Sequence, residues 1–195
     1  MKVIYIRDSK SRGYLRIGLS DGDKKYEYTI SEREYREQGS PLSGDEIYET
    51  EYLERCDMRY HARLYALRIL AYGDNNERTL IRKLLSRSVS SDIAKEVAAE
   101  MVGRGYINEQ RQLKRLVERE ACVNLLGRER IFAKLISKGY KSEDVSSVIE
   151  ELISSGQIDF EALKRKLIDK KLTENASSEE IRKLLYKHGY HTNFN

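Results

Sequence analysis

Basic side chains recur at matching positions along the second half of the chain. When the sequence is shifted by about 50 residues, Lys83 falls on Lys134 and Arg87 falls on Lys138, and His188 occupies the equivalent place further on. Evenly spaced cations can bind phosphates or an acidic protein groove, whereas single ones often only pair with Glu. We interpret the set as a whole as a partner- or DNA-binding surface. It comprises Arg82, Lys83, Arg87, Arg128, Arg130, Lys134, Lys138, Lys164, Arg165, Lys170, Lys171 and Lys187.

Residues able to carry out catalysis are not grouped in this sequence. His188 and His191 have no third ligand at a suitable spacing, so we predict no metal site there. Cys56 and Cys122 are far apart and have neither a metal-binding nor a redox spacing. We recognise no phosphate-binding loop, no Ser–His–Asp set and no catalytic pair of carboxylates. The sequence therefore predicts a protein that is not an enzyme and that needs no cofactor or metal.

Two ways of binding nucleic acid are disfavoured by the residues themselves. A helix that reads the major groove needs suitable polar side chains at its start. The helices expected after Ser91 and Ser142 instead begin with acidic residues, which would repel phosphate.

Stacking of bases on tyrosine rings is the second possibility, since the chain has 14 Tyr. Three of them lie at expected turns and should pack at helix ends, and three others should line helix contacts. The first group is Tyr106, Tyr140 and Tyr190, and the second is Tyr60, Tyr65 and Tyr72.

The basic residues lie on an internal repeat of helical pattern. The same shift of about 50 residues places Ile131 on Leu80, Leu135 on Leu84 and Gly156 on Gly105. Apolar residues at i, i+4 and i+5 make one narrow face on each short helix, which cannot be stable alone and must pack on its neighbours. Glycine before Tyr140 and before Tyr190 should end two of these helices with a left-handed residue.

The sequence predicts a mainly α fold with tandem three-helix repeats that form an elongated array. A small antiparallel β-meander should precede it, because runs of β-branched and aromatic residues over 2–7, 14–19 and 25–30 are separated by turn residues. Capping boxes at Ser31, Ser43 and Ser177 predict helix starts. We expect helices over about 43–55, 59–71, 77–87, 92–103, 109–124, 128–138, 143–154, 160–172 and 177–188.

These elements suggest five segments along the chain. They are a β region with a short helix over 1–42, connecting helices over 43–72, a first repeat over 73–124, a second over 125–172 and a shortened third over 173–195.

Composition agrees with a water-exposed helical protein. Of the 195 residues 39% are hydrophobic and 35% are charged, the latter well above the roughly 25% of an average globular domain. No apolar run approaches the roughly 20 residues that span a membrane, and the N-terminus lacks the apolar stretch of a secretory signal. Residues 1–70 hold equal numbers of basic and acidic side chains, so the net charge of +4 comes from residues 71–195. We expect a cytoplasmic protein without a membrane partner.

Several stretches together have the order and spacing of a known family. They are Tyr65-Ala-Leu-Arg-Ile-Leu70, Asn76-Glu-Arg-Thr-Leu80 followed by Leu84, Gly105-Tyr-Ile-Asn-Glu109, and Gly127, Ile131 and Leu135 followed by Lys138-Gly139-Tyr140. On these residues the sequence resembles the RecX family, bacterial modulators of the RecA recombinase. It departs from the family pattern at Asn75-Asn76, where Arg-Ser is usual, and at Gln112-Leu113, where Phe-Ala is usual. Its third repeat keeps only the first helix.

The resemblance implies a regulatory protein that lies in the groove of the RecA–DNA filament. It would bridge neighbouring subunits and hinder strand exchange, ATP turnover, repressor cleavage and filament extension, and so act on homologous recombination, DNA repair and the SOS response. The expected partners are the RecA filament and single- or double-stranded DNA, and the protein is expected to be a monomer. The alternative is a general nucleic-acid-binding helical protein without a role at RecA, and a pure scaffold array is a third possibility.

Overall fold

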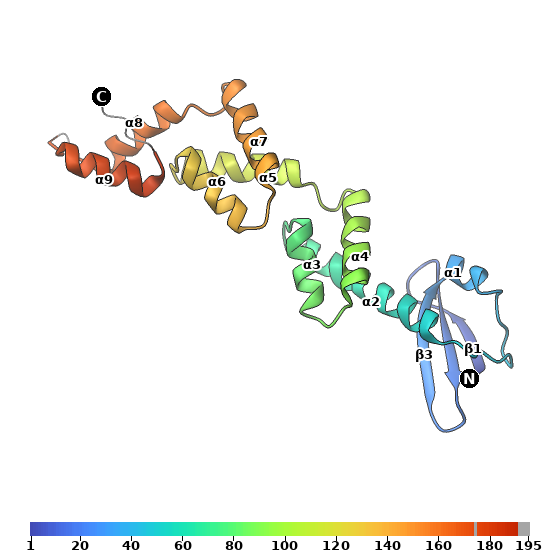
Figure 1. Ribbon diagram of the computed structural model, residues 1–195. Coiled ribbons are helices and arrows are strands. Elements are labelled where there is room, and N and C mark those ends of the chain that lie inside the picture. Colours follow the sequence, from blue (N-terminus) through green and yellow to red (C-terminus); the bar gives the residue numbers. More distant parts are fainter. Residues whose placement is uncertain (174, 191–195) are drawn as a thin grey trace. The chain divides into compact units, whose positions relative to one another are not determined.

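The computed structural model describes residues 1–173 and 175–190, and it is mainly α-helical after three N-terminal strands (Figure 1). His191, one of the histidine pair considered as a metal site, lies outside the described residues. The strands are β1 (Lys2–Asp8), β2 (Tyr14–Ser20) and β3 (Lys25–Ser31). The helices are α1 (Glu32–Glu37), α2 (Glu51–Tyr72), α3 (Glu77–Leu85), α4 (Ser91–Gly103), α5 (Glu109–Glu118), the π-helix η1 (Arg119–Val123), α6 (Arg128–Ser137), α7 (Ser142–Ser154), α8 (Phe160–Lys171) and α9 (Ser178–His188).

The chain divides into two compact units. The first comprises Met1–Gly73 and Leu80–Met101, and the second comprises Asp74–Thr79 and Val102–Asn195. Helix α3 therefore begins in the second unit and continues in the first. Within the described residues, no helix combines the length and the apolar character that crossing a membrane requires.

The N-terminal sheet has the predicted antiparallel meander, with the order β1-β2-β3. Ile17 on the central strand pairs with Ile6 on one side and with Tyr28 on the other. The Tyr5 ring covers Gly18, where an added Cβ would overlap it. One face of the sheet packs on α2 through a shared core of Val3, Ile17, Leu19, Tyr28, Ile30, Leu53 and Cys56.

One of the two capping boxes predicted in this region is present. Ser31 Oγ accepts from the backbone N–H of Glu34, whose carboxylate accepts from the N–H of Ser31 at 2.8 Å, and α1 follows.

The prediction of a helix from Ser43 is wrong for the residues before Glu51. The Val3 N–H donates to the Asp45 carbonyl, and the Gly44 N–H donates to the Val3 carbonyl, both at 2.8 Å. The segment therefore lies beside β1 and its backbone groups are not free to form a helix. Helix α2 begins only at Glu51, and it runs without a break through the gap predicted between 55 and 59.

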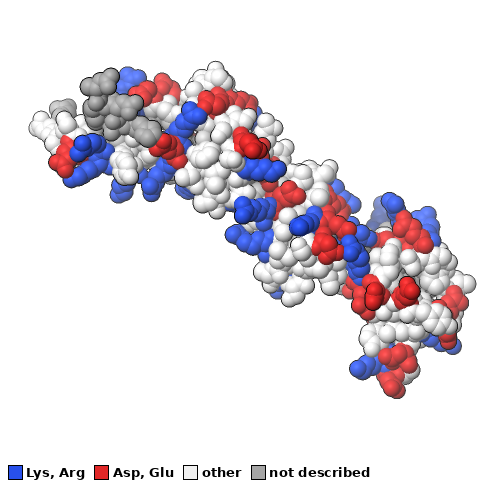
Figure 2. All heavy atoms as spheres, viewed as in Figure 1, with Lys and Arg blue, Asp and Glu red and all other residues white. Residues whose placement is uncertain are grey.

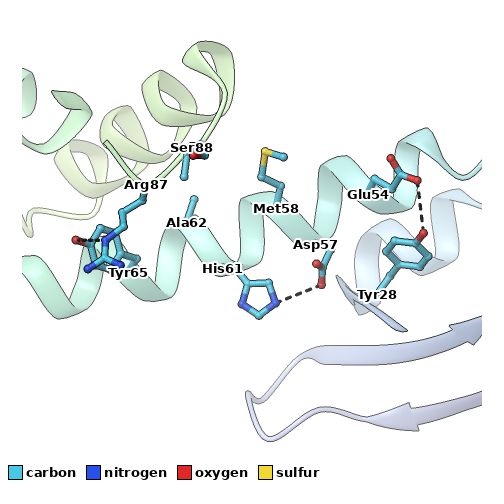
Figure 3. A pocket seen from close by; sticks show the side chains of 10 residues that line it. Tyr28, Glu54, Asp57, Met58, His61, Ala62, Tyr65, Arg87 and Ser88 are labelled. Carbon is cyan, nitrogen blue, oxygen red and sulfur yellow. Dashed lines mark hydrogen bonds and ion pairs between the residues drawn. The ribbon is translucent and has the colours of Figure 1, made fainter. Parts of the chain in front are cut away.

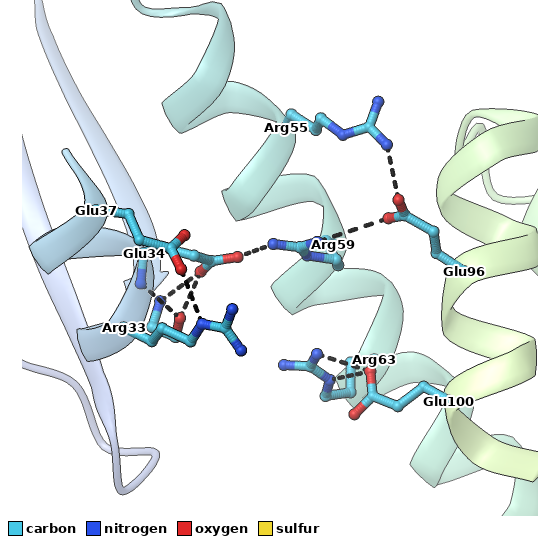
Figure 4. A network of polar contacts seen from close by, with 9 residues as sticks. Arg33, Glu34, Glu37, Arg55, Arg59, Arg63, Glu96 and Glu100 are labelled. Atoms are coloured by element: carbon cyan, nitrogen blue, oxygen red, sulfur yellow. Dashed lines mark hydrogen bonds and ion pairs between the residues drawn. The ribbon is translucent and has the colours of Figure 1, made fainter. Parts of the chain in front are cut away.

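Ion pairs join α2 to α4 in the first unit (Figure 4). Three arginines one turn apart on α2 meet acidic side chains: Arg55 contacts Asp92 at 2.6 Å and Glu96 at 2.9 Å, Arg59 contacts Glu34 and Glu96, and Arg63 contacts Glu100 at 2.7 Å. Partly exposed pairs contribute little energy singly. Their regular spacing instead favours one register of α2 against α4.

The second unit contains a core of three helices. Leu113 and Val117 of α5 pack with Ile131 and Leu135 of α6 and with Val145, Val148, Ile149 and Leu152 of α7. This core joins one helix of the segment predicted as the first repeat to two helices of the segment predicted as the second. The five segment boundaries suggested by the sequence stay a prediction.

A smaller core holds α8 against α9. Its buried members are Leu125, Leu167, Leu185 and Tyr190, with Phe160 and Leu163 packed on it. Phe160 and Tyr190 meet edge to face, with ring centroids 6.5 Å apart.

The helices α3, α6 and α9 end in equivalent turns, as the repeat predicts. Gly139 after α6 has φ +95° and Gly189 after α9 has φ +78°, so both residues are left-handed. At the equivalent place after α3 the left-handed residue is Ser88, with φ +61°. The apolar face is narrower than predicted, because Leu80 and Leu84 are buried whereas Leu85 remains 44% exposed.

We predict that Gly127→Ala destabilises the second unit. An added Cβ at Gly127 would overlap the carbonyl oxygen of Gly189. This oxygen belongs to the backbone, which cannot move aside as a flexible side chain can. Overpacking of this kind costs about 1–3 kcal/mol. The measurement is the free energy of unfolding in urea.

The matched control is Gly103→Ala, because a Cβ at Gly103 meets nothing within 4 Å. It should leave stability unchanged or raise it by less than about 1 kcal/mol. Equal effects of the two substitutions would show that the start of α6 is not packed against the turn after α9 as described.

Candidate partner-binding surface

Three of the predicted basic residues belong to the first unit. Arg82 and Lys83 are exposed on α3, and Lys83 also makes an interaction within the protein. Arg87 follows α3, and its Nε donates to the Tyr65 hydroxyl at 3.1 Å while its guanidinium lies 5.0 Å from the centre of the Tyr65 ring (Figure 3). Arg87 is therefore held against α2 and does not extend freely into solvent.

Lys134 is held by a buried carboxylate that sequence reasoning missed. Its Nζ lies 2.6 Å from Glu120 Oε2 in η1, and Glu120 is 1% exposed. Asn124 Nδ2 donates to the same oxygen at 2.6 Å, and Arg119 Nη2 donates to the other at 3.3 Å. Burial acts to raise the pKa of Glu120, but the hydrogen bonds from Lys134 and Asn124 outweigh it and the pKa lies below its ordinary value. Lys134 thus has a structural partner.

Other predicted cations of the second unit are also paired. Arg128 contacts Glu150, and Lys164 lies 3.4 Å from Glu161. Arg165 Nε donates to the carbonyl of Glu161 at 3.4 Å. Except for Lys164, these side chains are largely exposed, so a charged partner can still compete for them.

The remaining predicted cations of this unit are exposed and form no ion pair among the described residues. They are Arg130, Lys138, Lys170, Lys171 and Lys187. Four of them lie at the last turn of a helix: Lys138 caps α6, Lys170 and Lys171 end α8, and Lys187 is near the end of α9. A cation there offsets the negative end of the helix dipole, which is the structural alternative to partner binding.

The structure brings only part of the predicted set together. Lys170 and Lys171 are adjacent, and Lys187 lies on the helix that shares a core with α8. On the face that Figure 2 shows, Lys and Arg side chains lie among Asp and Glu, so no surface of a single charge sign covers it. We name Lys138, Lys170, Lys171 and Lys187 the helix-end lysines, and they are the strongest candidates for partner contact.

Tyr140, Tyr190, Tyr60 and Tyr65 lie where the sequence suggested, and Tyr106 and Tyr72 do not. Tyr106, predicted to pack at a helix end, is 53% exposed. Tyr140 and Tyr190 are buried beside the ends of α6 and α9, and burial raises the pKa of each to about 12. The Tyr140 hydroxyl donates to Gln112 Oε1 at 3.0 Å. Tyr60 is buried and Tyr65 stacks with Arg87, but Tyr72, expected in a helix contact, is 89% exposed. Tyr72 ends α2 at Gly73, where the chain leaves the helix before a neighbour can cover the ring.

The sequence did not predict that two polar side chains of the second unit, Glu120 and Gln112, are buried, although Gln112 stands at a departure from the family pattern. Glu120 is one acidic residue among many until the π-helix turns it inward. Gln112 is likewise buried, with its two polar atoms used by Asn75 and Tyr140. No group of three or more His, Cys, Asp or Glu side chains that could hold a metal occurs in the part of the chain that the structure describes.

We predict that Glu120→Gln lowers stability and flattens its dependence on acid pH. A carboxylate whose pKa is depressed in the folded state stabilises the fold above the unfolded pKa, near 4.5, and loses that contribution as pH falls through the lower folded pKa. Wild-type stability should therefore fall between about pH 5 and 3, and the variant should fall less. Urea unfolding at a series of pH values measures this.

The control is Glu150→Gln, which removes a carboxylate that is 55% exposed and pairs with Arg128. It should change the free energy of unfolding by less than about 1 kcal/mol. If Glu120→Gln behaves like this control at every pH, the buried contact to Lys134 does not stabilise the fold.

The fold resembles solved structures more clearly than the sequence resembles other sequences. A crystal structure of regulatory protein RecX matches with a TM-score of 0.74 and 20% identity, over 97% of this chain and 94% of that one. A crystal structure of RecX from Lactobacillus salivarius matches with a TM-score of 0.48 and 15% identity, over 68% of this chain and 97% of that one. No protein-family model and no curated protein sequence matches this sequence. The first likeness shows that this chain has the fold of the RecX crystal structure.

Proposed function

We propose that this protein is a regulatory protein that binds the RecA–DNA filament. By lying in the filament groove it would inhibit the recombinase, ATPase and coprotease activities of RecA. The observation that carries the proposal is the likeness to the regulatory protein RecX, which extends over 97% of the chain. The motifs at Leu80, Gly105 and Lys138-Gly139-Tyr140 point to the same family.

The repeated architecture supports binding to a repeating partner. Helices α6 and α9 end in equivalent turns, and each carries an exposed lysine at its last turn, Lys138 or Lys187. A filament offers the same acidic groups and phosphates once per subunit. His188 holds the position equivalent to Lys138, and Lys187 lies one residue before it at the same end of α9. Cations at the ends of successive helices can contact neighbouring subunits at the same time, and each added contact raises the effective affinity.

The proposed inhibition requires no chemistry from this chain. A protein that occupies the groove competes with the second DNA strand and with the repressor for the same space. Bridging of neighbouring subunits would also resist the changes that accompany ATP turnover. The chain's contribution is then binding alone, in which the helix-end lysines meet acidic side chains or phosphates.

We predict that the full chain slows DNA-dependent ATP hydrolysis by RecA at substoichiometric amounts. The joint substitution Lys138→Glu, Lys170→Glu and Lys187→Glu should weaken the inhibition at least tenfold, because three attractive contacts become repulsive. The measurement is the concentration of protein that halves the ATPase rate. An unchanged rate across the whole titration would remove the proposal.

A control for net charge is available in the first unit. Arg12→Glu, Lys24→Glu and Lys25→Glu make the same change of charge at exposed positions in the turns between strands and at the start of β3. This variant should inhibit like the wild type. If both triple variants lose activity equally, overall charge rather than the helix-end lysines sets the affinity.

A general nucleic-acid-binding protein is the second candidate, and the unpaired lysines are the observation that favours it. It predicts binding to DNA in the absence of RecA, with an affinity that falls steeply as salt rises because counterions are released from the phosphates. Fluorescence anisotropy with labelled single- and double-stranded DNA at several salt concentrations measures this. Strong inhibition of RecA without such binding would eliminate this candidate.

A further inference from the structure

The residues just before α3 dock into a groove of the second unit. Asn76 Nδ2 donates to the carbonyl of Lys138, the residue that caps α6, at 3.0 Å. Glu109 of α5 accepts from the N–H of Glu77 at 2.8 Å, and Gln112 of α5 donates to the carbonyl of Asn75 at 3.3 Å. We call residues 74–76 the α3 pre-helix segment, and the surface formed by α5 and the turn at 138–140 the α5 groove.

The residues just before α6 dock in the same way one repeat later. The N–H of Gly127 donates to the carbonyl of His188 at 2.7 Å. A Cβ at Gly127 would overlap the backbone of Gly189, and a Cβ at Gly189 would overlap Arg130. Leu125 is buried against Leu167, Leu185 and Tyr190, beside Phe160 and Leu163 of α8. Residues 125–127 are thus the α6 pre-helix segment, and α8 with the turn at 188–190 forms the α8 groove.

Each groove matches its occupant in polarity. The α5 groove presents Glu109 and Gln112 and holds the polar segment Asp74-Asn75-Asn76. In the α8 groove the equivalent positions, about 50 residues on, are Phe160 and Leu163, and it holds the apolar segment Leu125-Leu126-Gly127. In both grooves a donor of the segment satisfies the carbonyl that precedes the left-handed residue.

A third groove of this kind lies in the first unit, and no pre-helix segment from residues 1–173 or 175–190 occupies it. The shift that carries Arg87 to Lys138 also carries Met58 to Glu109 and His61 to Gln112. Met58, Ala62 and Val89 line a pocket of about 470 Å³ between α2 and the turn at 87–89 (Figure 3). We call it the α2 groove. Among the described residues no donor reaches the carbonyl of Arg87, which corresponds to the occupied carbonyls of Lys138 and His188.

The polar groups around the α2 groove already have partners. Asp57 accepts from the N–H of Thr29 at 2.8 Å and lies 3.5 Å from His61, and Glu54 lies 3.5 Å from the Tyr28 hydroxyl. Arg87 is held by Tyr65. What remains open is the apolar surface of Met58, which is 40% exposed, beside Ala62 and Val89. At Met58 the α2 groove is therefore apolar like the α8 groove, whereas His61, with a side chain that is 65% exposed, is polar where the α8 groove has Leu163.

We infer that the α2 groove is the docking site for a protein partner that inserts an apolar pre-helix segment, with two adjacent aliphatic residues directly before a helix N-terminus. The aliphatic pair covers Met58 and Val89, and a backbone N–H at the start of the partner's helix donates to the Arg87 carbonyl. A second copy of this chain does not offer such a segment, because its Leu125 is already buried against Leu167 and Leu185 of its own α8 groove. The residues before α9 that the structure describes, Asn175, Ala176 and Ser177, lack an aliphatic pair. This inference does not rest on the proposed action at RecA.

The test uses the chain's own α6 pre-helix segment as the probe. A blocked synthetic peptide of residues 124–135, Asn-Leu-Leu-Gly-Arg-Glu-Arg-Ile-Phe-Ala-Lys-Leu, is titrated into the labelled full chain and followed by NMR. The methyl signals of Met58, Ala62 and Val89 should shift and saturate. The same peptide with Asp in place of Leu125 and Leu126 should bind at least tenfold more weakly, since two aliphatic side chains lose their burial.

Two variants of the protein complete the test. Met58→Glu places a charge in the groove and should abolish the shifts, whereas Leu64→Glu, at a residue of α2 that is 42% exposed and outside the groove, should not. Shifts confined to Leu185 and Tyr190 would mean that the peptide only displaces its own copy from the α8 groove, and would overturn the inference. So would an absence of shifts, or a concentration-dependent increase of mass in sedimentation equilibrium that Met58→Glu removes, which would identify a second copy as the occupant.

Discussion

The hydrogen bond between the end of one short helix and the start of another organises the second unit. A helix of about ten residues leaves its last carbonyls without partners and cannot bury enough surface to be stable alone. Here the carbonyl of Lys138 accepts from Asn76, and that of His188 accepts from Gly127. A left-handed residue follows each of these carbonyls, and glycine at 139 and 189 adopts that conformation without steric cost. The apolar cores around Leu135 and Leu185 lie beside these helix ends.

This arrangement separates the structural cations from those open to a partner. Lys134 faces the buried Glu120, and Arg87 lies against Tyr65, so both contribute first to the fold. The helix-end lysines have no such partner among the described residues, and their backbone positions are fixed by the turns that end α6, α8 and α9. The backbone of these lysines is held in place, whereas their long side chains can change rotamer to meet a partner. That combination suits binding to a repeating, negatively charged partner, as proposed for the RecA–DNA filament.

The α2 groove lies at the end of α3, the first of the three equivalent helices α3, α6 and α9. There too the last carbonyls of a short helix need a partner. Helix α3 ends like α6 and α9, but Ser88 replaces glycine, and Arg87 and Ser88 line the pocket that also contains Met58. In the second unit the equivalent hollows are filled by the residues that precede α3 and α6. Each repeat contacts only its neighbours, so the first member of a series has no preceding repeat to supply such a segment. A partner segment can use it with the contacts that the chain uses internally.

The sequence alone determined the local structure. The strands, the helices after residue 59, the capping boxes at Ser31 and Ser177 and the left-handed turns all follow from residue types at fixed spacings, because these depend on neighbours within a few positions. Tertiary contacts decided the rest. Pairing with β1 keeps Ser43 out of a helix, the π-helix turns Glu120 inward onto Lys134, and backbone contact at Gly127 leaves no room for a side chain. Each of these contacts joins groups far apart in the chain, which no local sequence pattern encodes. The sequence therefore identified the candidate basic residues but not which of them are paired within the fold.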